Sequence, residues 1–470
     1  MKLTFWGAAQ QVTGSMHLVE LEGGTKILID CGLDYENKKD FEQNNAKFPF
    51  DPSELDLLIL THSHIDHSGN IPNLIKQGFS GLIVCSPPTL ELSDYLLQDS
   101  LNIQMMEIRK RRKQYYRKKN KKSSSNLPQP LYTKKHINEM IDLTTVLEIG
   151  ELFHFNDELQ LFFKPAGHIL GAVSVCLEVK EKGTVKRIGF TGDLGNFNSK
   201  LVPDPEPFSN IDYLVSESTY GGRQHITDSR KAEEVLLEEV IETCVNKKGK
   251  LVIPAFSVGR TQAILFTLNQ LFQEGKLPNI NIYTDSPLAI RSTKIYQFNL
   301  SYLNDEAKQF QHKHGSLFSF PLLNTVENEK ESEYLSVSTE PCVIVSAAGM
   351  VEGGRIQMHV RNNVSHEANT ILIAGFCAEG TLGDRLLKGQ DFVEIERRQR
   401  AVKAKILRTD VFSAHPDHNQ LLNYFQASNK GSLKQIYLVH GELDQMKKLA
   451  ADVRNIEVLT PFKGQSFELD

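Results

Sequence analysis

The chain has 470 residues, of which 40% are hydrophobic and 24% are charged, as in water-soluble globular proteins. No stretch approaches the roughly 20 apolar residues of a membrane span, and the N-terminus lacks the apolar region of a signal peptide. We therefore expect a cytoplasmic protein without membrane contact, and the length predicts two domains. The six cysteines are scattered without Cys-x-x-Cys pairs, which argues against disulfides and thiolate zinc sites.

The net charge of −5 is unevenly distributed along the chain. Ten of the fourteen residues in the range 109–122 are Lys or Arg. Such a run is either a solvated segment or an arm that binds a polyanion. Tyr115 and Tyr116 within it would add surface on which bases stack. Both interpretations stay open, and under the second one Lys118 and Lys119 are candidate phosphate contacts.

The first 200 residues contain short apolar runs bounded by Gly, Pro, Asn or Asp, which predict strands. A helical spacing of apolar residues follows over 90–113. Strand-rich sequence with helices between the strands is typical of a sheet sandwich covered by helices. The predicted strands are Leu3–Phe5, His17–Leu21, Lys26–Asp30, Leu57–Thr61, Gly81–Cys85, Leu159–Pro165, Ala172–Val179 and Lys186–Thr191.

From about residue 207 strands alternate with helices, which we expect at 229–247 and 260–273. The strands are continuously apolar, which indicates a parallel sheet buried on both faces. No Gly-x-Gly-x-x-Gly sequence follows the first of them, so a dinucleotide-binding fold has no support. The predicted strands are Tyr213–Ser216, Lys250–Pro254, Ile280–Thr284, Cys342–Ser346 and Thr370–Ala374.

Two further strands are expected near the end, at Ala404–Leu407 and Gln435–Val439. The simplest arrangement inserts the α/β domain into the first domain, which the last residues then complete. We therefore expect a first domain at 1–206, an inserted α/β domain at 207–396, and the returning part of the first domain at 397–470.

Four residues capable of binding metal lie directly after the apolar run at 55–61: His62, His64, Asp66 and His67. Neutral imidazole and carboxylate are ligands that Zn²⁺ accepts. The two earlier histidines point to one side if the segment is extended, because side chains alternate along a strand. The other two follow at the turn into a helix and can face a second ion. A polar loop that happens to hold three histidines is the alternative.

Three later residues also follow strands, where ligands gather in sheet-based folds: His168, Asp193 and His440. We expect two zinc ions per chain, each with an open position, although nitrogen and oxygen ligands would accept Mn²⁺ or Fe²⁺ as well. Asp193 would bridge the two ions, because a carboxylate can bind both and an imidazole cannot. The expected ligands are His62, His64 and His168 for one ion and Asp66, His67 and His440 for the other.

Asp30 ends a predicted strand and has two interpretations. In the first, it lies behind the ligands and holds an imidazole or its loop by hydrogen bonds. In the second, it only caps a turn with Cys31 and Gly32.

The cluster at 62–67, together with Asp30, His168 and Asp193, resembles the motifs of the metallo-β-lactamase fold, which implies a four-layer αββα sandwich with the metals at one edge. The inserted domain narrows the resemblance to the β-CASP branch, related to the cleavage-and-polyadenylation endonuclease and RNase J. The three motifs that carry it are Ser216–Gly221, Phe412–Asp417 and Leu438–Gly441, and further typical segments are 254–260, 285–289, 349–355 and 378–383.

The resemblance covers nearly the whole chain and implies a zinc-dependent ribonuclease, acting as an endonuclease with a 5′–3′ exonuclease mode left open. His440 in the third motif points to RNA rather than DNA. Unlike RNase J, the sequence ends soon after the fold closes, at Asp470, and carries no N-terminal RNA-binding module. Single-stranded RNA is the expected substrate, because a cleft between two domains admits one strand more readily than a duplex. Relatives also suggest a homodimer.

The expected mechanism is in-line attack on the phosphodiester by a hydroxide held between both metals, which leaves a 5′-phosphate. The expected catalytic residues are Asp66, Glu217 and His415. The resemblance pairs the last two: His415 would protonate the leaving 3′ oxygen or donate to the phosphate, and Glu217 would orient it. The spacing alone does not pair them, so a core-facing His415 and a Glu217 in a surface salt bridge remain the alternative.

Four residues of the inserted domain and the second motif are candidate phosphate contacts, because arginine suits bidentate phosphate binding: Arg260, Arg355, Arg385 and Ser413. Three other functions remain open: a DNA nuclease of the same fold, a hydrolase of small esters, and an inactive scaffold in an RNA-processing complex. A large inserted domain over the site argues against the small substrate, and the complete ligand set argues against the scaffold.

Overall fold

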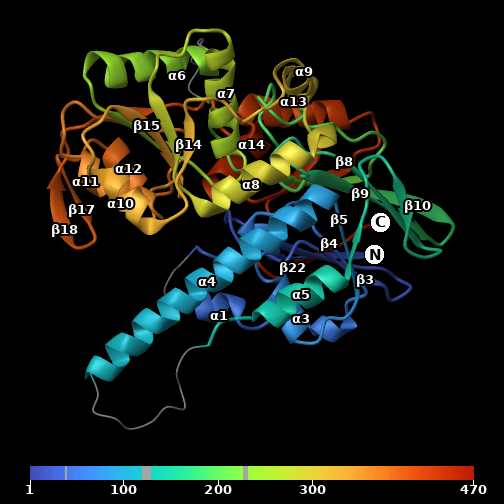
Figure 1. Cartoon of the computed structure of the whole chain (residues 1–470). Helices are drawn as coiled ribbons and strands as arrows, with labels where there is room; N and C mark the ends of the chain where they lie inside the picture. The colour runs from blue at the N-terminus through green and yellow to red at the C-terminus, as the bar shows by residue number, and fades with distance from the viewer. Residues whose placement is uncertain (37–39, 119–128, 226–230) are drawn as a thin grey trace.

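The computed structural model describes residues 1–36, 40–118, 129–225 and 231–470 (Figure 1). Within these ranges the chain forms two seven-stranded sheets, one six-stranded sheet and a hairpin of β17 (Phe392–Ile395) and β18 (Arg398–Ala401). Lys119 lies outside the described residues, and nothing is described of the side chain of Lys118, at the end of helix α4.

The first sheet joins the two ends of the chain, because its last strand pairs with its first in antiparallel register. Its middle strands are parallel to one another. In spatial order the strands are β22 (Gln465–Glu468), β1 (Lys2–Gly7), β2 (Met16–Glu20), β3 (Lys26–Ile29), β4 (Leu57–Ile59), β5 (Leu82–Cys85) and β6 (Thr144–Val146).

The second sheet combines an antiparallel half with three neighbouring parallel strands that come from distant parts of the sequence. In spatial order its strands are β21 (Glu457–Leu459), β20 (Gln435–Val439), β11 (Tyr213–Glu217), β10 (Thr184–Phe190), β9 (Val173–Glu181), β8 (Leu159–Pro165) and β7 (Leu152–His154).

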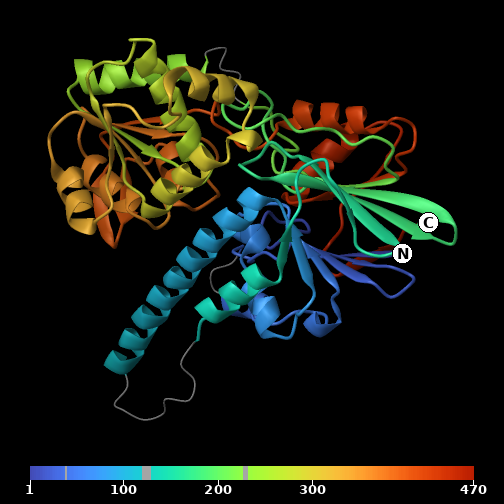
Figure 2. The ribbon, with the colours of Figure 1, turned by 45° about the vertical axis from the view of Figure 1, so that its right-hand side comes forward.

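The two sheets pack face to face because their strands are apolar on both sides. Ile27 and Ile29 of β3 enter the core between the sheets, whereas Leu28 lies in the core under the outer helices of the first sheet. On β11, Tyr213 likewise enters the core between the sheets, whereas Leu214 lies in the core under the outer helices of the second sheet. The result is the predicted four-layer αββα sandwich, which Figure 2 shows.

Helices close both outer faces of the sandwich. The first sheet is covered by α2 (Ile65–Ser68), α3 (Ile71–Lys76), part of α4 (Pro87–Lys118) and α5 (Lys134–Asp142), with the short α1 (Phe41–Asn45) beside them. The second sheet is covered by α13 (His418–Ser428) and α14 (Leu443–Asp452).

The third sheet belongs to the inserted domain and is parallel throughout, as the continuously apolar runs predict. Its order is β14 (Leu323–Thr325), β13 (Asn281–Thr284), β15 (Cys342–Ser346), β12 (Lys250–Pro254), β16 (Thr370–Ile373) and β19 (Lys405–Arg408). The helices around it are α6 (Ala232–Val240), α7 (Arg260–Gln273), α8 (Pro287–Phe298), α9 (Asp305–His314), α10 (Glu329–Val337), α11 (Ile356–Asn363) and α12 (Leu382–Leu387).

One predicted strand joins a different sheet than expected. The strand expected at 404–407 was assigned to the returning part of the first domain, but β19 pairs with β16 in the sheet of the inserted domain. A four-residue strand carries too little pattern to say which sheet it joins. The division at residues 206 and 396 stays a prediction. Among the described residues, no helix is both long and apolar enough to cross a membrane.

Replacing Leu58 by alanine should lower the free energy of unfolding by about 2–5 kcal/mol, because this fully buried side chain packs between β4 and the outer helices. Chemical denaturation measures the change. Leu152→Ala is the matched control, since that leucine is 47% exposed on the edge strand β7, and we expect a change within about 0.5 kcal/mol. Equal effects of both substitutions would contradict the proposed core.

Candidate metal centre

The loop that carries the histidine cluster is fixed by one buried carboxylate, Asp30, at the end of β3. Asp30 accepts hydrogen bonds from the backbone N–H of Thr61 (2.8 Å) and from its hydroxyl (2.9 Å). Its Oδ2 also lies 2.7 Å from Nδ1 of His67. Because Nδ1 donates to the carboxylate, Nε2 carries a lone pair directed at the centre when the ring of His67 is neutral. The structure thus places Asp30 behind a ligand imidazole.

The structure brings all seven candidate ligands together in two groups. In each group the potential ligand atoms lie within 4.8 Å of one another, a separation that one ion can bridge. The first group is His62, His64, His168 and Asp193, and the second is Asp66, His67 and His440.

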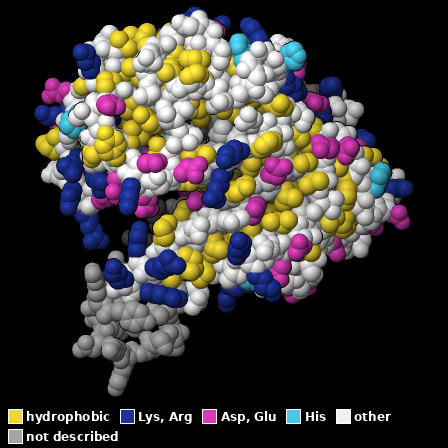
Figure 3. All heavy atoms as spheres, viewed as in Figure 1, with side chains coloured by type: hydrophobic (Ala, Val, Ile, Leu, Met, Phe, Trp, Pro, Cys, Tyr) yellow, Lys and Arg dark blue, Asp and Glu magenta, His cyan; other side chains and the backbone are white. Residues whose placement is uncertain are grey.

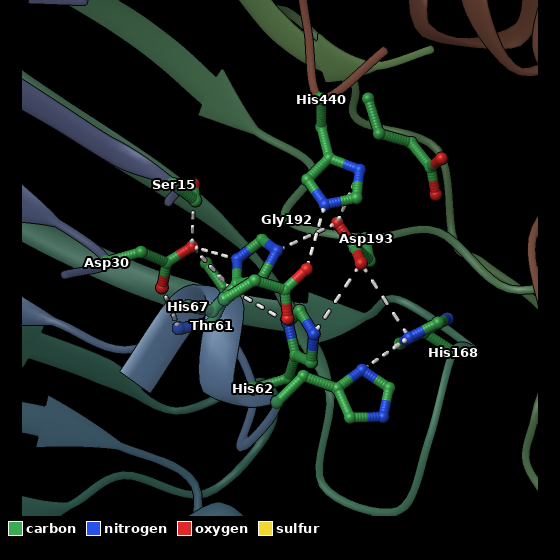
Figure 4. Close-up of polar contacts among 12 residues, drawn as sticks. Ser15, Asp30, Thr61, His62, His67, His168, Gly192, Asp193 and His440 are labelled. Carbon is green, nitrogen blue, oxygen red and sulfur yellow. Dashed lines mark hydrogen bonds and ion pairs between the residues drawn. The ribbon is translucent and has the colours of Figure 1, made fainter. Parts of the chain in front are cut away.

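Asp193 lies between the two groups, as Figure 4 shows. Its Oδ2 is 3.6 Å from Nε2 of His62 and 3.7 Å from Nε2 of His168. Its Oδ1 is 3.2 Å from Nε2 of His67 and 3.6 Å from Nδ1 of His440. One carboxylate oxygen therefore faces each group, which is the geometry that a bridging ligand requires.

Several polar atoms of these residues find no hydrogen-bond partner in the described part of the protein, and a bound metal ion would take the place of one. Nε2 of His62, Nε2 of His67 and Oδ1 of Asp193 are buried and make no hydrogen bond. Nε2 of His67 and Oδ1 of Asp193 approach to 3.2 Å. Burial lowers the pKa of His67, but Asp193 and Asp30 outweigh it and raise the pKa well above its usual value, so without a metal a proton takes the place of a cation between the two atoms. A buried polar atom without a partner costs about 1–3 kcal/mol, and a shared cation removes this cost. The nitrogen and oxygen donor set suits Zn²⁺.

The protonation of the first group also favours metal binding. Burial lowers the pKa of His62 and His168 well below the usual value, and it lowers the pKa of His64 to about 4. These rings are therefore neutral at physiological pH, which is the form that binds metal. The ring of His168 is oriented by the carbonyl of Ala414, which lies 3.0 Å from Nδ1 and leaves Nε2 for the centre.

His415 and Glu217 form a buried pair beside this centre. Nδ1 of His415 lies 3.1 Å from both carboxylate oxygens of Glu217, which is fully buried at the end of β11. Burial lowers the pKa of His415, but the charge and hydrogen bond of Glu217 outweigh it and raise the pKa. The ring of His415 is 4.6 Å from that of His168. Glu217 is therefore not in a surface salt bridge, and His415 faces the candidate metal ligands.

Sequence reasoning missed one residue that holds this pair. Nε2 of His225 lies 2.9 Å from the carbonyl of His415, so an Nε2–H would donate to the loop that carries the candidate acid. Tyr220 stands edge-on to both rings. His225 follows the motif at 216–221 by only four residues, and this nearness to a motif was the available signal.

A cavity of about 60 Å³ opens between the two domains beside His168, lined by Asn196, Lys200, Arg260 and Ser413 among others. Ser413 therefore borders the site as predicted for a phosphate contact. Arg260 is buried, donates to the carbonyl of Phe412 and stacks 4.9 Å from the ring of Phe256. Its guanidinium thus connects the segment that carries Phe412 with the ring of Phe256.

Arg355 also makes contacts within the inserted domain. It donates to Asp285 at 2.7 Å and to the carbonyls of Val326 and Glu327. These contacts engage the guanidinium of Arg355 and Nε of Arg260 within the fold, and the assignment of both residues to phosphate stays a prediction. Arg385 keeps a buried Nε without a hydrogen bond, and its role stays a prediction.

Comparison with known families accounts for most of the chain. Residues 10–236 match the family model of the metallo-beta-lactamase superfamily, and residues 261–386 match that of the Beta-Casp domain. Residues 400–461 match a Zn-dependent metallo-hydrolase RNA specificity domain. The three matches follow the chain in the order sandwich, inserted domain and returning segment.

Two individual relatives match over almost their full length, and a third over part of its length. The chain is 30% identical to a ribonuclease of Thermus thermophilus over 96% of this chain and 95% of that protein. It is also 30% identical to an RNase J-like protein of Methanocaldococcus jannaschii, over 98% of both chains. The transcription termination factor FttA of the same archaeon is 30% identical over 99% of this chain and 70% of its own length. The chain therefore belongs to the β-CASP family of metal-dependent hydrolases with the metallo-β-lactamase fold.

Proposed function

We propose that the protein is a zinc-dependent ribonuclease that hydrolyses single-stranded RNA during RNA processing or decay. The observation that carries this proposal is the position of Asp193, with one carboxylate oxygen facing each group of buried imidazoles. The Glu217–His415 pair beside it supplies a proton donor at the same place. The ribonuclease names of two full-length relatives support RNA as the substrate.

The seven candidate ligands would hold two zinc ions, His62, His64 and His168 on one side, Asp66, His67 and His440 on the other, and Asp193 between them. Bound there, the ions would supply a nucleophilic hydroxide at neutral pH and neutralise charge on the phosphoryl oxygens. Asp66, 26% exposed in its side chain, lies at the open edge of the centre, 3.4 Å from His440, and would help to orient the attacking water.

His415 would hold a proton on Nε2 for the leaving 3′ oxygen, since Nδ1 is taken up by Glu217. Glu217 stays in place because the backbone N–H of Leu194 donates to it at 2.6 Å. The carboxylate thus fixes the orientation of the imidazole and stabilises its protonated form.

Two alternatives remain: a DNA nuclease of the same fold and an inactive scaffold. The scaffold is less favoured because all seven candidate ligands are present and converge. The choice between endonuclease and 5′–3′ exonuclease action, and the homodimer, stay predictions.

The deciding experiment incubates purified, zinc-loaded protein with 5′-labelled single-stranded RNA and DNA of the same sequence, with and without a chelator. We expect cleavage of RNA, products that carry 5′-phosphate, and loss of cleavage with the chelator. Preferred cleavage of DNA would select the first alternative, and no cleavage of either would select the scaffold.

Replacing Asp193 by asparagine should remove bound zinc and lower cleavage at least about a hundredfold, because it removes the negative charge shared by both groups. Elemental analysis and the cleavage assay measure the two effects, and circular dichroism checks that the fold persists. Asp157→Asn, at an exposed turn, is the matched control and should leave both unchanged. Full zinc content in D193N would contradict the proposed centre.

Replacing Asp30 by asparagine should weaken zinc binding by about 10- to 100-fold, the usual effect of removing a residue that orients a ligand imidazole. The affected contact is that between Asp30 and Nδ1 of His67. Competition with a chromophoric chelator measures the affinity. Unchanged zinc affinity would show that Asp30 only caps a turn and does not orient His67.

Glu217→Gln and His415→Ala should each lower kcat by about 10²–10⁴-fold, the usual contribution of general acid catalysis. Zinc content should stay at the wild-type value, since neither side chain belongs to a ligand group. His312→Ala, exposed on α9, serves as control. A loss of zinc in parallel with activity would show that the pair only supports the centre structurally.

A further inference from the structure

Helix α4 has an exposed face that the fold does not explain. Its first turns are fixed beside the metal centre, because the hydroxyls of Ser86 and Thr89 both donate to the carbonyl of Gly171, in the loop that carries His168. The helix also packs against α2, which carries Asp66 and His67. It then runs outward beyond the sandwich, as Figures 1 and 2 both show.

One face of α4 is packed against the protein in the first part of the helix and exposed in the second part. Residues spaced three and four apart share a helix face, and on this face Leu92, Tyr95 and Leu96 pack against the inserted domain. The same face continues outward without cover. The exposed residues there include Asn102, Ile103 (47% exposed), Met106 (51%), Arg109, Lys110 and Lys113.

The charges on this outer face are not paired within the protein. Among the described residues, Arg109, Lys110 and Lys113 have no acidic partner, whereas Arg111, on another side of the helix, contacts Glu42. Neighbouring like charges on a helix are unfavourable. Three unpaired cations next to two exposed apolar side chains therefore fit an external partner that is both anionic and partly apolar.

The position of this face suggests what the partner is. Figure 3 shows a hollow between the inserted domain and the projecting helix, with Lys and Arg side chains on the projecting helix and side chains of both charge signs along the edge of the domain that faces it. A single strand of nucleic acid offers phosphates for such charges and bases for the apolar side chains.

We propose that the face of α4 formed by Ile103, Met106, Arg109, Lys110 and Lys113 binds the single-stranded RNA substrate at a distance from the cleavage site. This inference rests on the ribonuclease function proposed above. From Leu96 to Lys113 the helix rises about 25 Å at 1.5 Å per residue. A stacked strand covers this distance with about seven nucleotides at 3.4 Å each. Six stacked nucleotides cover only about 20 Å, so an RNA of this length bound at the metal centre ends before Lys110 and Lys113.

The test compares a 6-nucleotide and a 30-nucleotide RNA with the zinc-loaded enzyme. The variant replaces Arg109, Lys110 and Lys113 by glutamine, and the control variant replaces Lys276, Lys308 and Lys313 of the inserted domain by glutamine. We expect the first variant to raise KM for the long RNA at least about tenfold at low salt, with kcat unchanged. In a plot of log affinity against log salt concentration, the magnitude of the slope should fall by about 2, because three phosphate contacts are lost. KM for the short RNA should not change.

A charge-preserving variant, Arg109→Lys with Lys113→Arg, should have the wild-type KM. This result would show that the charge of these side chains matters, and not a change in the structure of the helix. Wild-type KM for the long RNA in the triple glutamine variant would overturn the proposal and leave the face to an acidic protein partner. An equal loss on both RNAs would also overturn it, since the effect would then arise at the metal centre. Cleavage of the short RNA by the wild-type enzyme tests the proposed function separately.

Discussion

The centre of this protein depends on one constraint, the burial of the Asp193 carboxylate among four imidazole rings. An ionised carboxylate in such surroundings is strongly unfavourable unless a positive charge compensates it. Burial keeps the rings of His62 and His168 neutral. Burial also lowers the pKa of His67 and His440, but the charge of Asp193 outweighs it and raises both, so protons on these two rings compensate the carboxylate when no metal is bound. Cations bound by the seven candidate ligands would replace these protons, so metal binding would be coupled both to proton release and to the stability of the folded state.

Strand order explains how distant residues meet this constraint. In the second sheet β10, β11 and β20 are parallel neighbours, and Glu217 of β11 pairs with Val439 of β20, one residue before His440. The antiparallel β9 lies between β8 and β10, so these two strands also run in one direction. The segments after β8, β10, β11 and β20 therefore leave the same edge and deliver His168, Asp193, Glu217 and His440 to one place.

What could be predicted from the sequence follows from local pattern. Ile27, Leu28 and Ile29 alternate between two cores, so their strand was readable from apolar spacing, and the density of ligands at 62–67 revealed the site. The contacts of Arg260 and Arg355 within the fold could not be predicted, because a Gly-Arg turn looks the same whatever its guanidinium meets, here the carbonyl of Phe412 and the carboxylate of Asp285. The sheet that β19 joins and the contact of His225 with His415 likewise depend on tertiary partners.

The segment at 409–417 connects the two domains chemically as well as covalently. It leaves β19 of the inserted sheet and enters α13 of the sandwich. Within it the carbonyl of Phe412 accepts from Arg260, the carbonyl of Ala414 orients His168, and His415 pairs with Glu217. A shift of the inserted domain against the sandwich would therefore disturb a ligand imidazole and the candidate acid together. Through this segment the inserted domain would act on His168 and on the candidate acid at the same time.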